Sequence, residues 1–109
     1  REPGGSPGAE KIRSLLLYGG AKDQGPLAEA MQFAAARADH VDATIQPALE
    51  RGAWVLCDRY SDSTRVYQGE AGVEQEYLKL LELAAVAGLR PDMTLLIVVP
   101  PKTGLSRVA

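Results

Sequence analysis

Residues 53–57 read Ala-Trp-Val-Leu-Cys, and this apolar run leads directly into Asp58 and Arg59. An apolar run of this length without alternation is typical of a strand buried on both faces of a parallel sheet. A second run of this kind spans residues 93–99 and is closed by two prolines. Because helical patterns precede and separate the two runs, the sequence predicts an α/β fold in which helices cover a parallel sheet.

Helical patterns fill the first half of the chain. Ser6 followed by Pro7 has the form of a helix start, with a capping hydroxyl and a proline at the first helical position. Apolar residues recur at three- and four-residue steps over residues 27–49, which predicts a long helix. Pro47 lies inside that pattern and predicts a kink or a break near Ile45.

The second half is expected to continue with a polar loop that follows Arg59 and runs through Gly72. A helix is then predicted over residues 73–87, with Gly88 as its stop. Residues 103–109 have the pattern of a helix that is only beginning. We therefore expect the sequence to be a fragment, with one partial domain over residues 1–109.

Composition excludes several classes of protein. The net charge of −2 provides no positive field to attract nucleic acid or an anionic membrane, and no apolar run is long enough to span a bilayer. A single cysteine cannot form an intramolecular disulfide, and no cysteine and histidine residues have metal-ligand spacing. We expect a cytoplasmic protein that binds neither nucleic acid nor membrane.

Asp58 and Arg59 are the first candidate functional pair. Ligands of open α/β sheets bind beyond the carboxyl ends of the strands, where this pair is expected to lie. The aspartate can hold a water bound to Mg²⁺, and the arginine can bind a phosphate through two nitrogens. The alternative is that polar residues simply end a strand.

A second pair, Phe33 and Arg37, lies one helical turn apart and therefore on one face of the long helix. An aromatic ring can stack on a planar base, while a guanidinium one turn later can donate to a carbonyl on the edge of that base. The alternative is a core phenylalanine beside an arginine that extends its charged end to solvent. His40, on the same helix, is expected to be a surface or helix-packing residue, because no acid–base or metal partner accompanies it.

Residues 61–69, Ser-Asp-Ser-Thr-Arg-Val-Tyr-Gln-Gly, form the third candidate. The neutral hydrogen-bonding groups of Ser63, Thr64, Tyr67 and Gln68 could distinguish the functional groups of a small polar ligand. The alternative is an ordinary helix start, which would use one serine only.

The order and spacing of several blocks resemble the thymidylate kinase family over almost the whole sequence. The most specific blocks are the Asp-Arg-Tyr-x-Asp-Ser-Thr-x-x-Tyr-Gln-Gly pattern from Asp58 to Gly69 and the preceding Arg-Gly-Ala-Trp-Val-Leu-Cys. The other blocks are REPGGSP at 1–7, AEKIRSLLL at 9–17, FAAARADHV at 33–41 and LRPDMTLLIVVPP at 89–101.

The resemblance implies a fold and an activity. The fold would be the three-layer parallel sheet of P-loop nucleoside monophosphate kinases, present here in part, with a further strand between the runs at 53–57 and 93–99. The enzyme would transfer the γ-phosphoryl group of ATP to dTMP, with Mg²⁺ as cofactor, and form a homodimer. Two alternatives stay open: a kinase for another deoxynucleoside monophosphate, and a non-catalytic remnant that serves as an association module.

The resemblance also implies roles on the base and sugar side of the substrate. Phe33 would stack on the thymine and Arg37 would donate to it. Thr64 would bind the edge of the base with Gln68 nearby, and Tyr67 would pack against the deoxyribose, where it disfavours a 2′-hydroxyl.

On the phosphate side, the resemblance implies that Arg13 and Arg59 face the substrate's phosphate. Asp58 would support the Mg²⁺–phosphate network through water rather than as a direct ligand, and Glu2 and Pro3 would lie beside the nucleoside. Asp58 and Arg59 are thus the expected catalytic residues.

The sequence departs from the family pattern in one major respect. No G-x-x-x-x-G-K-[ST] loop, which cradles the phosphates of ATP, occurs in these residues. We therefore expect the chain to be the dTMP-binding portion, without the phosphate loop and the lid, and to be inactive on its own. The two predicted strands would also lack a shared neighbour.

Overall fold

The computed structural model describes residues 1–108, with the side chains of residues 21 and 22 left out of the description. The chain is largely helical. Its elements are α1 (Pro7–Tyr18), the 3₁₀-helix η1 (Ala21–Gln24), α2 (Pro26–His40), the π-helix η2 (Val41–Ile45), α3 (Gln46–Glu50), α4 (Tyr60–Glu70), α5 (Gln75–Val86) and α6 (Pro101–Val108).

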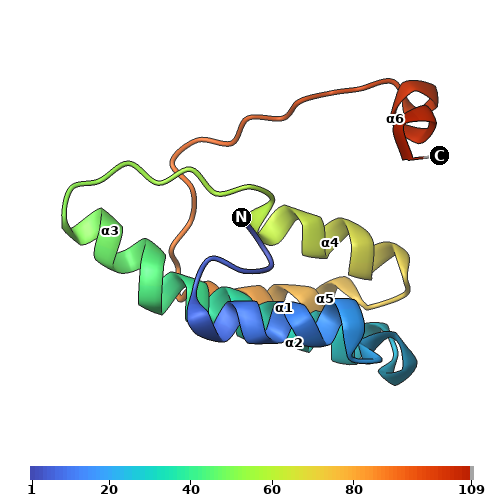
Figure 1. Ribbon diagram of the computed structural model, residues 1–109, viewed down its shortest axis with the longest axis horizontal. Helices are drawn as coiled ribbons and strands as arrows, with labels where there is room; N and C mark the ends of the chain where they lie inside the picture. The colour runs from blue at the N-terminus through green and yellow to red at the C-terminus, as the bar shows by residue number, and fades with distance from the viewer. Residues whose placement is uncertain (109) are drawn as a thin grey trace.

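Helix α2 is central, since α1, α4 and α5 all pack against it (Figure 1). The core consists of small clusters on its surface. In one cluster Ala30 contacts Val73 and Leu78, and in the other Ala34 packs with Ala85 and Val86. Alanines on α2 let the neighbouring helices approach closely. As a result, the faces of α2 and α4 that carry polar side chains are brought together.

The start of α1 confirms the expected cap. Ser6 is the N-cap and its Oγ accepts a hydrogen bond from the Ala9 amide at 3.4 Å. Asp39 of α2 reinforces the cap, because its Oδ2 accepts from the same amide at 3.0 Å and from Ser6 Oγ at 2.5 Å. Hydrogen bonds from these groups hold the pKa of Asp39 below its usual range. The cap therefore also ties α1 to α2.

The predicted kink near Ile45 is confirmed as a π-helical turn over Val41–Ile45. The Gln46 amide donates to the Val41 carbonyl, five residues back, instead of four. Pro47 has no amide hydrogen to donate, so the normal α-helical pattern cannot run through it. The long helix predicted over residues 27–49 is thus divided into α2, η2 and α3.

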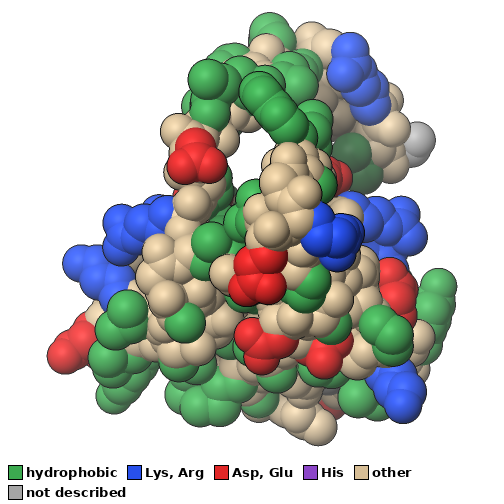
Figure 2. All heavy atoms as spheres, turned by 90° about the vertical axis from the view of Figure 1, so that its left-hand side faces the viewer, with side chains coloured by type: hydrophobic (Ala, Val, Ile, Leu, Met, Phe, Trp, Pro, Cys, Tyr) green, Lys and Arg blue, Asp and Glu red, His purple; other side chains and the backbone are tan. Residues whose placement is uncertain are grey.

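The predicted parallel sheet is wrong, since no strand occurs within residues 1–108. Residues 53–57 and 93–99 are outstretched segments without regular structure, and they carry apolar side chains into solvent: Trp54 is 93% exposed and Leu96 is 85% exposed. Figure 2 shows hydrophobic side chains over the arch at the top of the molecule. A strand is stable only when its backbone groups pair with a neighbour, and the helices offer these segments no edge. The described chain is therefore helical, not an α/β sandwich.

Residues 61–69, expected as part of a polar loop, lie in helix α4. The helix predicted over 73–87 is confirmed as α5, which ends at Ala87 in the left-handed conformation. The last helix, predicted to open at residue 103, is confirmed as α6, although α6 already begins at Pro101; residue 109 lies outside the described residues. Helix α6 stands apart from the other helices at the end of the second outstretched segment (Figure 1).

Among the described residues, no helix has both the length and the apolar character that crossing a bilayer requires.

Candidate functional site

A pocket of about 280 Å³ opens where the N-terminal segment, α2 and α4 meet. Its volume is close to the lower end of the range typical of small-molecule sites, roughly 300 Å³ and upward. The residues that line it come from regions far apart in the sequence: Glu2, Pro3, Glu29, Phe33, Arg37, Arg59, Tyr60, Ser63, Thr64, Tyr67 and Gln68.

Arg37 is buried in the wall of this pocket and is only 3% exposed. Its Nε donates to Glu2 Oε2 at 2.6 Å. Its Nη2 donates to the Tyr60 carbonyl at 2.8 Å and to Thr64 Oγ1 at 3.1 Å. These bonds compensate the buried charge and fix the plane of the guanidinium, with Nη1 remaining for a ligand. Arg37 does not extend its charged end to solvent, as the alternative interpretation required.

Spacing along the helix explains why α2 presents three residues to the pocket. Glu29, Phe33 and Arg37 follow one another at four-residue steps, so they lie on one face. Phe33 is partly buried and keeps an open side towards the pocket. The arrangement provides a flat apolar surface with a cation one turn beyond it.

Helix α4 contributes the opposite wall. Thr64 and Gln68 are buried, one turn apart, and Gln68 Nε2 donates to Glu29 Oε1 at 2.8 Å. Ser63 and Tyr67 lie on the neighbouring stripe, and Tyr67 is 58% exposed at the mouth of the pocket. The wall therefore changes from buried polar groups inside to an exposed phenol at the entrance.

Arg59 and Tyr60 begin α4 in strained backbone conformations. Arg59 has φ +80° and ψ −59°, and Tyr60 has φ +48°, both rare for residues with a side chain. The Arg59 guanidinium lies over the Tyr67 ring, with its carbon 5.4 Å from the ring centre. The turn thus directs an exposed cation to the pocket at the entrance side, next to Tyr67.

Tyr60 is held from both ends. Its hydroxyl donates to the Leu89 carbonyl at 3.0 Å, and the Arg37 guanidinium lies 5.7 Å from its ring centre. Burial, with a smaller contribution from the nearby Glu2 carboxylate, raises the pKa of Tyr60 to about 12. The phenol is therefore neutral at physiological pH.

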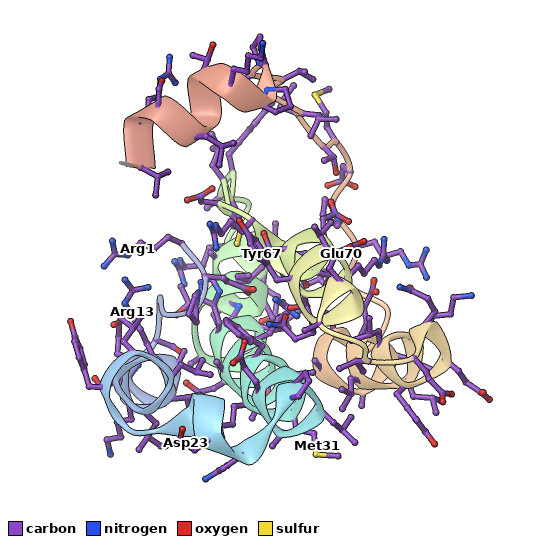
Figure 3. All side chains as sticks on the ribbon, turned by 90° about the vertical axis from the view of Figure 1, so that its right-hand side faces the viewer. Arg1, Arg13, Asp23, Met31, Tyr67 and Glu70 are labelled. Carbon is purple, nitrogen blue, oxygen red and sulfur yellow. The ribbon has the colours of Figure 1, made fainter. Side chains whose placement is uncertain are left out.

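Arg13 and Asp58, both predicted at the site, do not line the pocket. Arg13 Nη1 donates to the Pro3 carbonyl at 2.9 Å and so supports a lining residue from behind. Arg13 extends on the same side of the molecule as Arg1 (Figure 3). Asp58 is exposed, and its carbonyl accepts from the Glu2 amide at 3.2 Å. The other predicted residues all line the pocket, and their roles stay predictions.

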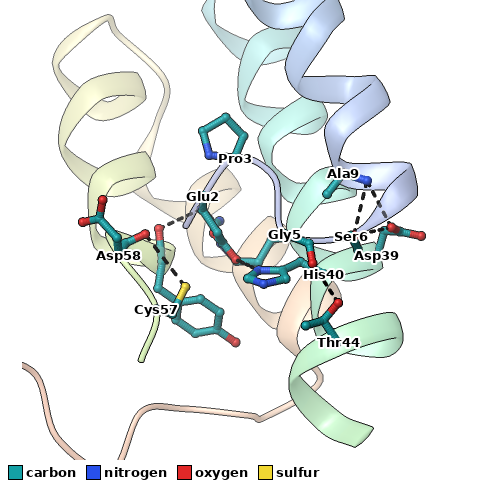
Figure 4. A network of polar contacts seen from close by, with 12 residues as sticks. Glu2, Pro3, Gly5, Ser6, Ala9, Asp39, His40, Thr44, Cys57 and Asp58 are labelled. Atoms are coloured by element: carbon teal, nitrogen blue, oxygen red, sulfur yellow. Dashed lines mark hydrogen bonds and ion pairs between the residues drawn. The ribbon is translucent and has the colours of Figure 1, made fainter. Parts of the chain in front are cut away.

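Sequence reasoning missed Glu29, Tyr60 and His40. The four-residue spacing to Phe33 could have indicated Glu29. His40 was assigned no acid–base partner, yet it is buried and its Nδ1 lies 3.0 Å from Glu2 Oε1 (Figure 4). No sequence signal joins residues that are 38 positions apart, so only the fold reveals this contact.

Comparisons with known proteins agree on one family. A protein-family model described as thymidylate kinase matches residues 1–109. A thymidylate kinase from Nitrobacter winogradskyi is 56% identical over 110 residues, which cover 100% of this chain and 48% of the relative. One from Nitrobacter hamburgensis is 54% identical with the same coverage, and one from Afipia carboxidovorans is 55% identical over 108 residues, covering 98% of this chain and 47% of the relative.

The chain thus spans about half the length of the curated relatives it matches. The match includes every residue that lines the pocket, and the family model covers the chain from end to end. On this basis the chain belongs to the thymidylate kinase family.

Proposed function

We propose that this chain provides the acceptor side of a phosphoryl transfer from ATP to dTMP, with the pocket between α2 and α4 holding the nucleoside. The observation that carries the proposal is the pairing of Phe33 with the fixed guanidinium of Arg37 in one small pocket. The ring would stack on the thymine, and Arg37 Nη1 would donate to a carbonyl on the edge of the base. Family membership supports the same activity.

Polar groups of α4 would define the rest of the substrate. Thr64 is held by Arg37 and Gln68 by Glu29, so both present fixed rather than freely rotating groups to the base. Tyr67, at the mouth of the pocket, would pack against the deoxyribose. A ribose 2′-hydroxyl there would meet an aromatic ring instead of a hydrogen-bonding partner, which favours a deoxynucleotide.

Arg59 and Asp58 would act on the phosphate. Arg59 is an exposed cation at the entrance, suited to bind the phosphate of dTMP. Asp58 offers an exposed carboxylate next to it, a hard oxygen ligand that fits Mg²⁺ bound through water. Mg²⁺ bound with ATP would neutralise negative charge on the phosphoryl group that is transferred. Positioning by these residues, without a covalent intermediate, would be the chain's contribution to the reaction.

The 109 residues contain no phosphate-cradling loop of the P-loop type. The proposal therefore assigns the chain dTMP binding, and no phosphoryl transfer when it is isolated. We further propose a cytoplasmic location and, for the whole protein, a homodimer.

Titration calorimetry with dTMP and with thymidine tests the proposal, because the two ligands differ only in the phosphate. Phe33→Ala should weaken the binding of both ligands about equally, by tenfold or more (about 1.4 kcal/mol). Arg59→Ala should weaken dTMP alone by a similar factor. Arg51→Ala, at an exposed position next to α3, is the matched control and should change neither affinity.

The alternatives predict different results. Tighter binding of another deoxynucleoside monophosphate would make the chain the acceptor side of a kinase for that nucleotide. If no nucleotide bound while the chain self-associated in size-exclusion chromatography, the association-module alternative would hold instead.

A further inference from the structure

Three side chains with different metal-binding atoms converge next to the pocket, which one of them, Glu2, also lines. Glu2 comes from the N-terminal segment, His40 from the end of α2 and Cys57 from the outstretched segment before α4 (Figure 4). One donor atom from each lies within 4.8 Å of the others. Glu2 and His40 are buried and Cys57 is partly buried. In the described part of the chain, this is the group in which such atoms gather.

The orientation of each donor is fixed by a contact on its far side. Glu2 Oε2 is held by Arg37 Nε at 2.6 Å, which leaves Oε1 facing His40 Nδ1 at 3.0 Å. His40 Nε2 faces Gly5, at which any side chain would collide with the ring. Nδ1 is therefore the imidazole nitrogen directed into the group.

The spacing is close to that around a tetrahedral ion. Zinc binds sulfur at about 2.3 Å and nitrogen or oxygen at about 2.0–2.2 Å, so neighbouring ligands lie roughly 3.5 Å apart. The Oε1–Nδ1 distance of 3.0 Å is shorter than that value and all three donor atoms lie within 4.8 Å of one another, so ion binding needs shifts of at most about 1 Å. Partly buried Cys57, in a segment without regular structure, can make such a shift.

We propose that Glu2 Oε1, His40 Nδ1 and Cys57 Sγ bind one divalent ion of the zinc class, with water as the fourth ligand. Binding displaces the thiol proton of Cys57 to solvent and leaves the imidazole proton on Nε2. The thiolate and the carboxylate offset the two charges of the ion, and because Arg37 continues to hold Glu2 from its other oxygen, the group of ion, ligands and guanidinium carries one net positive charge. Such outer contacts orient a ligating carboxylate.

Thiolate and imidazole ligands select Zn²⁺ and Co²⁺ over Mg²⁺, which prefers oxygen ligands in octahedral geometry. The site is therefore distinct from the Mg²⁺ that accompanies ATP. It also does not depend on the proposed function, because binding of the ion is measured without a nucleotide, although Glu2 lines the pocket as well.

The composition of the chain makes a direct test possible. Cys57 is the only cysteine and His40 the only histidine in the sequence. Titration of the purified protein with Co²⁺ should produce a thiolate-to-cobalt charge-transfer band with the intense visible absorption of tetrahedral cobalt. Zn²⁺ should abolish both signals at one equivalent, and a large excess of Mg²⁺ should not.

Variants assign the ligands. Cys57→Ser should remove the charge-transfer band, and His40→Gln and Glu2→Gln should each weaken Zn²⁺ binding at least tenfold. Glu76→Gln, at an exposed position in α5, is the control and should bind as the unmodified chain does. Circular dichroism should show that the variants retain their helices. If Glu2→Gln unfolds, the other two variants decide the result.

Two results would overturn the proposal. One is the absence of a thiolate band at any Co²⁺ concentration that leaves the protein folded. The other is a Zn²⁺ affinity that is unchanged in both Cys57→Ser and His40→Gln, which would place the ion elsewhere.

Discussion

Glu2 and Arg37 form a buried ion pair with 2.6 Å between Oε2 and Nε, although 35 residues separate them in the chain. The pair joins the N-terminal segment to the middle of the molecule. Because Glu2 also meets His40, one carboxylate holds two cationic or polar partners in place. Much of the local order of the pocket depends on it.

Removing one partner of this pair should be costly. Glu2→Ala would leave the Arg37 charge buried without its carboxylate, so we expect a loss of about 3–5 kcal/mol in the free energy of unfolding. Urea unfolding followed by circular dichroism measures it. The double variant Glu2→Ala/Arg37→Met removes both charges and should recover part of that loss. A double variant that loses as much free energy of unfolding as Glu2→Ala alone, or more, would contradict this account.

The strained backbone at Arg59 leads to an unusual order of stabilities. Glycine adopts φ +80° without the steric cost that a Cβ brings, so Arg59→Gly should be more stable than Arg59→Ala by about 1–2 kcal/mol. In the interior of α5 the order should be reversed, with Lys79→Gly about 1 kcal/mol less stable than Lys79→Ala. Thermal unfolding of the four variants makes the comparison. If the glycine variant were the less stable one at position 59 as well, the backbone of residue 59 would not be strained.

The raised pKa of Tyr60 predicts a loss of stability at alkaline pH. The phenol ionises near its ordinary value of 10 in the unfolded chain and at about 12 in the folded one. Its stabilising contribution is therefore complete below pH 10 and is lost as the pH rises towards 12. Ultraviolet titration should show an ionisation step near pH 12, and Tyr60→Phe should remove that late step. A titration curve that Tyr60→Phe leaves unchanged in this range would refute the burial of this phenol.

Gly5 should tolerate no side chain. Gly5→Ala would place a Cβ against the His40 ring at φ +93°, and we expect a loss of about 2–4 kcal/mol from strain and overpacking together. Gly52→Ala has a similar φ of +76° but meets no neighbouring atom within 4 Å, so its loss should come from strain alone. Chemical unfolding of both variants isolates the collision with His40. Losses of equal size would show that the ring moves aside.

Local signals in the sequence were sufficient for the start of α1 and for the interruption of the long helix. Ser6 and Pro7 predicted the start of α1, because the capping hydroxyl and the first helical residue are neighbours in the chain. Pro47 predicted the interruption of the long helix, because it lacks the amide that an α-helix requires. Where the controlling interaction lies within one or two turns, the sequence is enough.

The prediction of two strands was wrong for the opposite reason. An apolar run such as residues 53–57 becomes a strand only if another segment pairs with it, and the pattern of the run itself carries no information on that neighbour. The loop predicted at residues 61–69 was wrong for another reason. Hydroxyl and amide side chains are common in loops, but at four-residue spacing they also form the polar face of a helix. The partnership of His40 with Glu2 arises only when the chain folds back.

The exposure of Trp54 gives the protein an optical label of its own. It is the only tryptophan in the sequence, so the fluorescence excited at wavelengths that tyrosine does not absorb comes from an indole surrounded by water. Whatever comes to cover residues 53–57 should move that emission to shorter wavelengths. A single native tryptophan therefore reports on the segment that the helices leave uncovered.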